Sequence, residues 1–161
     1  FRRKETFATT GPRMKVRFFA GYEYSDEMLD APDLTRLAYD GGVPMGGDLI
    51  GTGNAPTFLA WAQRDPNMGA LQRVQIIKVT SDGEAVFDVA CHTGTPDPTT
   101  HRCPDNGAAV DMETCTPTGD GASELSGLAG PGFRSGPAGN LLCARARKSE
   151  LSLVDLGGHA G

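Results

Sequence analysis

The clearest pattern along the chain is an alternation of apolar and polar side chains with a period of two residues. It begins in RMKVRFFA, residues 13–20, where every second side chain is apolar and basic groups fill most positions between them. This period is typical of a strand with one buried face. Three more stretches are rich in β-branched or aromatic residues and predict further strands: PTFLAWA (56–62), LQRVQIIKVT (71–80) and AVFDVA (85–90).

Turn signals separate these strands. RDPN at 64–67 lies between the second and third, and SDGE at 81–84 joins the last two as a hairpin. Strands that follow one another without amphipathic helices favour an antiparallel arrangement. We therefore predict a mainly β fold, an antiparallel β-sandwich-like domain with long loops.

Helical signals are few. FRRKETF, residues 1–7, resembles the last turns of a helix, which Gly11 and Pro12 would end, so we expect a short N-terminal helix remnant. A short helical turn is expected near 33–37. GGVPMGGD, residues 41–48, lacks the lysine of a phosphate-binding loop and predicts a tight connection between strands.

Regular patterns fade in the second half of the chain. Residues 91–118 predict a long loop region, and residues 119–139 contain seven glycines without a periodic apolar pattern. Residues 141–161 resemble a weak helix at best. We expect a poorly ordered C-terminal tail.

Composition supports a loop-rich β domain. The 161 residues include 22 Gly and 11 Pro, which interrupt regular elements and favour turns. No apolar stretch approaches the ~20 residues that span a bilayer, so no membrane span is predicted. Residues 1–19 carry six basic groups against one acidic group, within a net charge of −5. Without interleaved aromatics or a known module, this basic start does not indicate a nucleic-acid partner.

Four cysteines occur, and Cys91, Cys103 and Cys115 are spaced by twelve residues each. No C-x-x-C pair exists, which argues against a zinc site. Disulfide bonding in an oxidising compartment is favoured over free thiols for these three residues. This favours a periplasmic or extracellular location.

Candidate chemistry is sparse. Asp105, Asn106 and Asp111 offer metal-ligand types without the ligand spacing of a calcium loop, and turn formation explains the same residues. No serine lies in a G-x-S-x-G elbow, so no catalytic residue is predicted. Trp61, the sole tryptophan, lies in an apolar strand and is expected to pack in a core or an interface.

Several blocks resemble one bacterial family, known as DUF3604. They are RRKETFATTGPRMKVRFFAGY, GGVPMGGDL, APTFLAWAQRDP, LQRVQIIKV and the cysteine block from Asp88 to Cys115. The resemblance covers Phe1 to about Leu128. Family members are several times longer, many carry export signals, and their N-terminal part resembles a PHP-type metal-dependent phosphoesterase.

The resemblance implies that this chain is the C-terminal part of such a protein. Residues 1–10 would end the PHP-like region, 11–128 would form the β-rich domain, and 129–161 an irregular tail. A divalent metal would bind upstream, with no cofactor in this fragment and the PHP-like domain as its partner. Thr9, Thr10 and Arg13 would lie at the junction and are the candidate substrate contacts.

The tail departs from the family pattern. Plausible codons for residues 151–159, displaced by one base, would spell Cys-Arg-Trp-Ser-Thr-Trp-Glu-Ala-Met, which begins with a block found in the family. We hypothesise that the reading frame slips near Ala129. A final strand would then be lost and a sheet edge left unpaired.

Three functional hypotheses follow. The first is a non-catalytic β-domain that completes a PHP-like hydrolase of the same protein. The second is a stand-alone ligand- or carbohydrate-binding β module of the cell envelope. The third is a truncated product without function.

Overall fold

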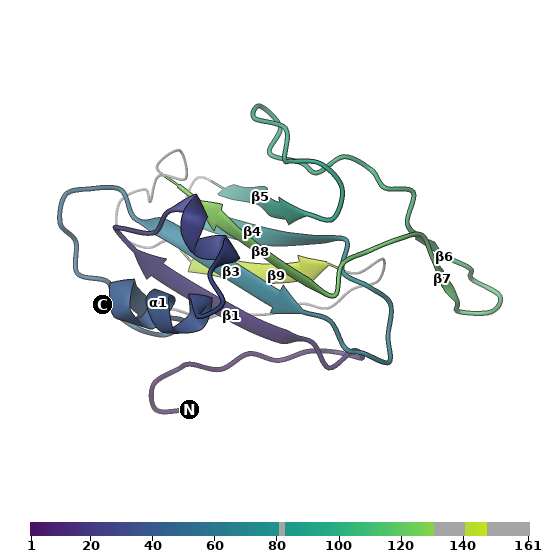
Figure 1. Ribbon diagram of the computed structural model, residues 1–161, viewed down its shortest axis with the longest axis horizontal. Coiled ribbons are helices and arrows are strands. Elements are labelled where there is room, and N and C mark those ends of the chain that lie inside the picture. Colours follow the sequence, from purple (N-terminus) through teal and green to yellow (C-terminus); the bar gives the residue numbers. More distant parts are fainter. Residues whose placement is uncertain (81–82, 131–140, 148–161) are drawn as a thin grey trace.

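The computed structural model describes residues 1–80 and 83–130 and the backbone of residues 141–147. Two antiparallel sheets form the body of the molecule (Figure 1). Sheet A has the order β2 (Gly42–Pro44), β1 (Lys15–Gly21), β3 (Thr57–Gln63), β8 (Glu124–Ala129). Sheet B has the order β5 (Gly83–Cys91), β4 (Arg73–Thr80), β9 (Leu141–Arg147). The mainly β, antiparallel fold predicted from the sequence is confirmed.

The inner faces of the two sheets enclose the main core. β1 turns Val16 and Phe18 inward, as its alternation predicts, and β4 contributes Val74 and Ile76. The ring of Phe18 stacks on that of Phe58, with centroids 5.8 Å apart. Burial of these side chains supplies most of the driving force for the fold.

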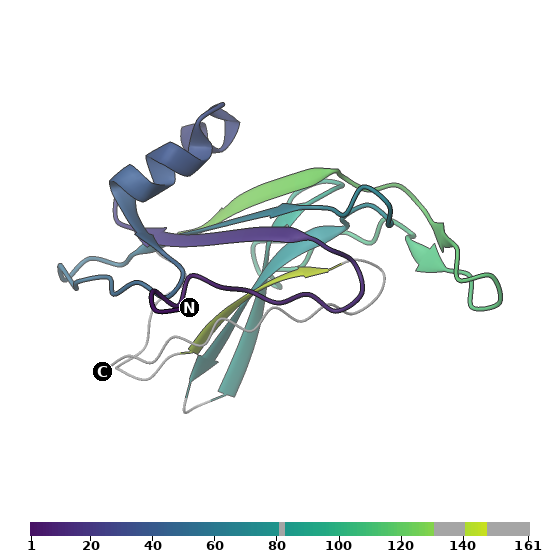
Figure 2. The same ribbon diagram turned by 90° about the horizontal axis from the view of Figure 1, so that it is seen from below.

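Two short helices cover part of the outer face of sheet A (Figure 2). They are the 3₁₀ helix η1 (Asp26–Asp30) and α1 (Leu34–Gly41). Beneath them Tyr24 is buried, and its hydroxyl donates a hydrogen bond of 2.6 Å to the Ala38 carbonyl. Trp61 packs against the edge of this second cluster, in agreement with its predicted packing role.

The two sheets come into backbone contact along β8 and β5. A Cβ built on Gly127 of β8 would lie 2.1 Å from the carbonyl oxygen of Val89. No side chain fits there, so glycine is required for this close approach.

A small ribbon of β6 (Ala109–Val110) and β7 (Pro117–Thr118) projects from one end of the molecule (Figures 1 and 2). It lies in the region predicted as a long loop. Two-residue strands carry too little periodicity to be seen in a sequence.

Two predictions about secondary structure were wrong. Phe1–Phe7 is not helical: the backbone makes a turn at Lys4, which has a positive φ of 56°, and then extends along β1. An isolated helical turn is costly to nucleate, and here the segment packs its side chains on the sheet edge instead.

The second error concerns the end of the chain. β8 occupies part of 119–139, where no strand was expected, and 141–147 forms β9 rather than a weak helix. Each pairs with a strand distant in sequence, β3 and β4 respectively. The frame-slip hypothesis expected an unpaired sheet edge without saying which, and the edge of β4 is paired by β9. The rest of the proposed tail, 131–140 and 148–161, lies outside the described residues.

Candidate binding site

The edge of sheet A at β1 is only partly covered. β2 pairs with Phe19, Ala20 and Gly21, and the Met45 amide donates to the Phe18 carbonyl at 2.7 Å. In an antiparallel strand, the backbone N–H and C=O groups of a residue point to the same side as those of the residue two positions before it. The Phe18 carbonyl faces β2 and its following turn. The backbone of Val16 therefore faces this edge, where no strand pairs with it within residues 1–80, 83–130 and 141–147.

The N-terminal segment, residues 1–8, lies across this edge. It packs on the turn after β2, where Gly46 has a φ of 79°. A Cβ on Gly46 would lie 2.6 Å from the Arg3 carbonyl oxygen. Glycine thus permits both the turn and the close approach of the segment.

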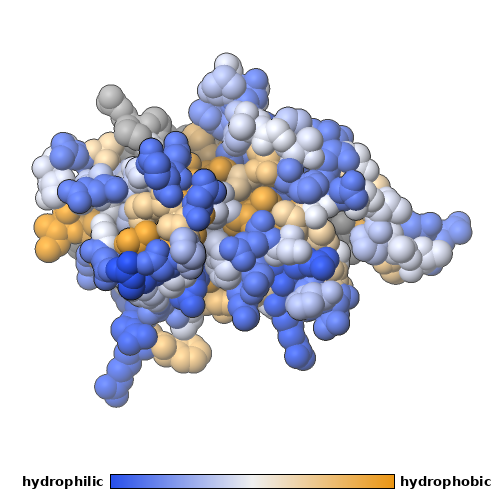
Figure 3. Space-filling model, in the orientation of Figure 1, coloured by the Kyte–Doolittle hydropathy of each residue, from blue (hydrophilic) through white to orange (hydrophobic). Residues whose placement is uncertain are grey.

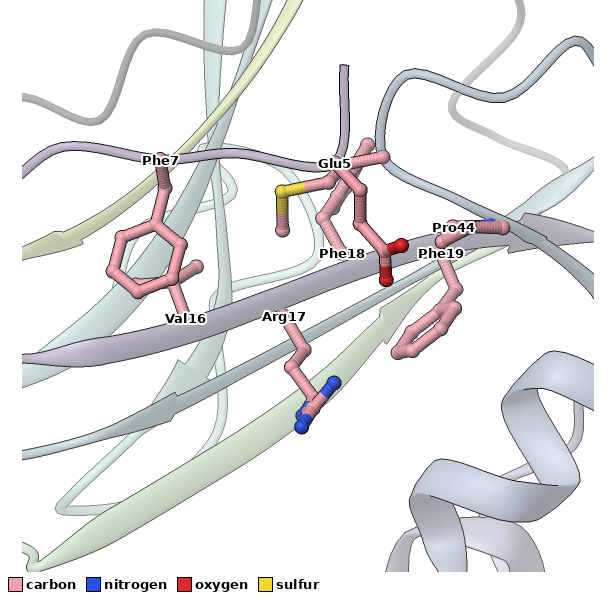
Figure 4. Close-up of a pocket in the computed structure, with 8 residues that line it drawn as sticks. Glu5, Phe7, Val16, Arg17, Phe18, Phe19 and Pro44 are labelled. Atoms are coloured by element: carbon pink, nitrogen blue, oxygen red, sulfur yellow. The ribbon is translucent and has the colours of Figure 1, made fainter. Parts of the chain in front are cut away.

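A pocket lies between the segment and β1 (Figure 4). Six of its eight lining residues are apolar, and Glu5 and Arg17 are the charged ones. The lining residues are Glu5, Phe7, Val16, Arg17, Phe18, Phe19, Pro44 and Met45. Its volume of about 100 Å³ is small beside the roughly 300–1,000 Å³ of pockets for drug-sized ligands. It is suited to one side chain of a partner rather than to a whole substrate.

Glu5 is the centre of a polar cluster beside the pocket. Its carboxylate accepts a hydrogen bond from the Tyr39 hydroxyl and forms an ion pair of 3.3 Å with Arg3. This hydrogen bond is the main cause that raises the pKa of Tyr39 above its usual value of 10.0. The ring of Tyr39 in turn packs edge-on against Phe19, with centroids 5.0 Å apart. Glu5 thus ties the N-terminal segment to helix α1.

The arrangement is suited to binding. It offers an apolar floor, an unpaired backbone edge and two opposite charges. Among the residues that the structure describes, neither a nucleophile with an adjacent base nor a set of metal ligands converges there. Such a site can receive an extended peptide edge with an apolar side chain.

The predicted substrate contacts lie near the start of β1. Thr9 is half-buried, whereas Thr10 and Arg13 are exposed. The Arg13 backbone amide donates to Asp65 Oδ2 at 2.9 Å, which anchors the entry to β1. None of the three lines the pocket, and their role in substrate binding stays a prediction.

The disulfide prediction is confirmed for Cys91 and Cys103, and the described residues offer no partner for Cys115. Cys91 and Cys103 form a disulfide with Cα atoms 5.6 Å apart. Cys115 is an exposed free thiol. It lies in the turn of the β6–β7 ribbon, which projects away from the body of the molecule and so has no cysteine partner among the described residues (Figure 1).

The weak metal alternative is not supported by the geometry. Asp105 and Asp111 each accept hydrogen bonds from amides two or three residues later, and Asn106 accepts one from Gln72. The amides of Thr114 and Glu113 lower the pKa of Asp111. These are turn-forming roles. Within the described part of the chain, no three acidic, histidine or cysteine side chains could hold a metal ion.

A buried carboxylate escaped the sequence analysis. Asp88 of β5 accepts hydrogen bonds from Gln75 Nε2 at 2.5 Å and from the Cys103 amide at 2.6 Å. Arg73 adds an ion pair at 3.3 Å. Gln75 of β4 and Asp88 of β5 lie opposite each other, and theirs is the only pair in the register of these two strands in which both residues are polar. Their position inside two apolar strands was the available signal.

The family comparison agrees with the resemblance carried by the sequence blocks. Residues 1–136 match the model of DUF3604, described as a protein of unknown function. The chain belongs to this family. No curated protein and no solved structure matches it.

Two further findings concern the cellular compartment of this DUF3604 domain. The Cys91–Cys103 disulfide is compatible with an oxidising compartment. Among the described residues, no helix is long and apolar enough to cross a membrane.

Proposed function

We propose that this chain is a non-catalytic β-domain that packs against a metal-dependent, PHP-like hydrolase region of the same exported protein. The edge of β1, with its pocket and its unpaired backbone, is the docking surface. The divalent metal and the catalytic ligands belong to the partner region.

The observation that carries the proposal is the partly open edge of β1. An exposed edge strand is an aggregation hazard unless it is covered. Here the N-terminal segment covers it incompletely, with Phe7 still 41% exposed and Phe1 fully exposed. Exposed aromatic side chains beside an unpaired edge are typical of a surface that a partner covers.

The charges beside the pocket support a specific contact rather than a merely apolar one. Glu5 and Arg17, which carry opposite charges, are among the residues that line the pocket. Such an arrangement selects a partner with complementary charges and fixes its orientation.

The experiment is a binding assay between this chain and the region encoded directly upstream in the same gene. Calorimetry measures the dissociation constant for the original chain and for Phe7→Asp. The added charge at an apolar contact is expected to weaken binding by about tenfold or more. Ile50→Asp is the matched control, because Ile50 is an equally apolar residue, 83% exposed, that does not line the pocket.

Activity is measured in parallel with p-nitrophenyl phosphate and Mn²⁺. This chain alone is expected to be silent, and the upstream region active only with its metal. The proposal fails if this chain turns over the substrate unaided. It also fails if the upstream region lacks metal ligands, or if both Asp variants bind like the original chain.

A further inference from the structure

Three strands of sheet A bring six side chains onto one outer face beside the helices. In the register of the sheet, Arg17 lies opposite Trp61, which lies opposite Ser126. In the next row, Lys15, Gln63 and Glu124 are aligned in the same way. Residues directly opposite in an antiparallel sheet share a face.

This face is solvent-accessible. Its neighbours along β1 and β3, such as Val16 and Ala62, point into the core instead. The helices cover the other half of the sheet, over Phe19 and Leu59. Figure 3 looks onto this side of the molecule and shows mainly hydrophilic residues beside the helices, with smaller apolar areas between them.

Trp61 is held in place at the centre of the face. Its Nε1 donates a hydrogen bond of 2.5 Å to Glu124 Oε1, and one side of the side chain packs on the helix-covered cluster. The side chain remains half-buried rather than enclosed. A fixed, partly exposed indole is suited to stacking, since little side-chain entropy is lost when a ligand binds.

A basic row borders the tryptophan. Lys15 and Arg17 are both exposed and lie about 6.8 Å apart, because strand residues rise ~3.4 Å each. Arg13, also exposed, lies two residues before β1 begins. Neither Arg13 nor Lys15 forms an ion pair with another described side chain. In a chain with net charge −5, this row is a local site for anions.

We propose that this face binds an acidic oligosaccharide, with a sugar ring stacked on Trp61 and sugar carboxylates paired with Arg13, Lys15 and Arg17. The apolar face of a pyranose ring matches the indole, and Gln63 and Ser126 supply hydrogen bonds to hydroxyls. A nucleic acid would call for several aromatic rings along the strand, and this face has one. The site is distinct from the proposed docking edge, apart from Arg17, which borders both.

The test uses the fluorescence of Trp61, the only tryptophan in the chain. Oligogalacturonate is titrated into the whole chain, with a neutral cello-oligosaccharide of equal length as the reference ligand. A saturating change in intensity or wavelength is expected with the acidic ligand, and at least about tenfold weaker binding with the neutral one.

Two matched variants complete the experiment. Arg13→Ala/Lys15→Ala is expected to weaken binding by about tenfold, whereas Arg2→Ala/Arg3→Ala, which removes the same charge elsewhere, leaves it unchanged. Trp61→Phe, measured by calorimetry, is expected to retain weaker binding of the same ligand. The proposal is overturned if no binding occurs, if both double variants bind alike, or if single-stranded DNA binds as tightly as oligogalacturonate.

Discussion

Two charged clusters in this molecule contain similar groups and differ in their surroundings. Asp88 has a side chain with no exposed surface, and three donors, two from β4 and the Cys103 amide, fix its carboxylate. Glu5 is 20% exposed and bonds to an arginine that is 87% exposed. The first cluster is closed and satisfied, so its role is to hold the fold. The second is open to a partner.

The largest expected effect is in the closed cluster. Asp88→Ala leaves Gln75 Nε2 and the Cys103 amide without this acceptor and removes the ion pair of the partly buried Arg73. Removing one partner of a buried pair costs about 3–5 kcal/mol of unfolding free energy. Urea denaturation measures the loss. Asp88→Asn, which keeps one carbonyl acceptor, is the milder control. A loss below about 1 kcal/mol for Asp88→Ala would show that the cluster stabilises the fold no more than an exposed ion pair does.

The disulfide is expected to rank second. Cys91→Ser/Cys103→Ser opens a loop of twelve residues and is expected to cost about 3 kcal/mol. The Cys103 amide also bonds to Asp88, so the disulfide and the carboxylate hold the same loop. Combined with Asp88→Ala, the double-cysteine change should therefore cost less than the sum. If the losses in unfolding free energy were additive, the disulfide and the Asp88 carboxylate would stabilise the loop independently.

A pH experiment tests the buried phenol of Tyr24 by comparing the original chain with Tyr24→Phe. Burial raises the pKa of Tyr24 to about 12 from its usual 10.0. Because the folded state holds this proton more tightly, the stabilisation is complete below pH 10 and is lost as the pH rises towards about 12. In Tyr24→Phe the unfolding free energy should fall less steeply over this range. Equal slopes for both proteins would contradict the assignment.

The smallest expected effect on stability is in the open cluster. Glu5→Gln is expected to cost no more than about 1 kcal/mol, as exposed ion pairs do. It should nevertheless return the pKa of Tyr39 towards 10.0, because the hydrogen bond from Tyr39 to the carboxylate is the main cause of its raised value. A spectroscopic titration of tyrosinate checks this, with Tyr24 as the internal reference. An unchanged titration curve would show that Glu5 does not accept the hydrogen bond from Tyr39.

Strands with strong local patterns were predictable. β1, β3, β4 and β5 each carry an alternation or an apolar run that reports their own burial. β8 was missed because ELSGLA contains a serine and a glycine that weaken the period. The glycine is required by contact with Val89, which is a property of the folded pair and not of the segment.

The site was less predictable than the fold. The disulfide candidates included both true partners, but spacing could not tell Cys103 from Cys115 as the partner of Cys91. The pocket at β1 arises from the N-terminal segment, which was predicted as helix. Its extended course depends on β1 and on Gly46, which is distant from it in the chain.

Gly127 has a consequence on the opposite side of the molecule. Where β8 meets β5, the two layers touch through main-chain atoms, whereas near β1 bulky rings and Met45 fill the space. The two sheets are therefore closest together at β8 and β5, and this short separation is possible because Gly127 has no Cβ. Because packed interiors transmit strain rather than absorb it, adding a Cβ there would tilt one layer on the other. The gap beside Phe7 would then change width although no residue around it had been altered.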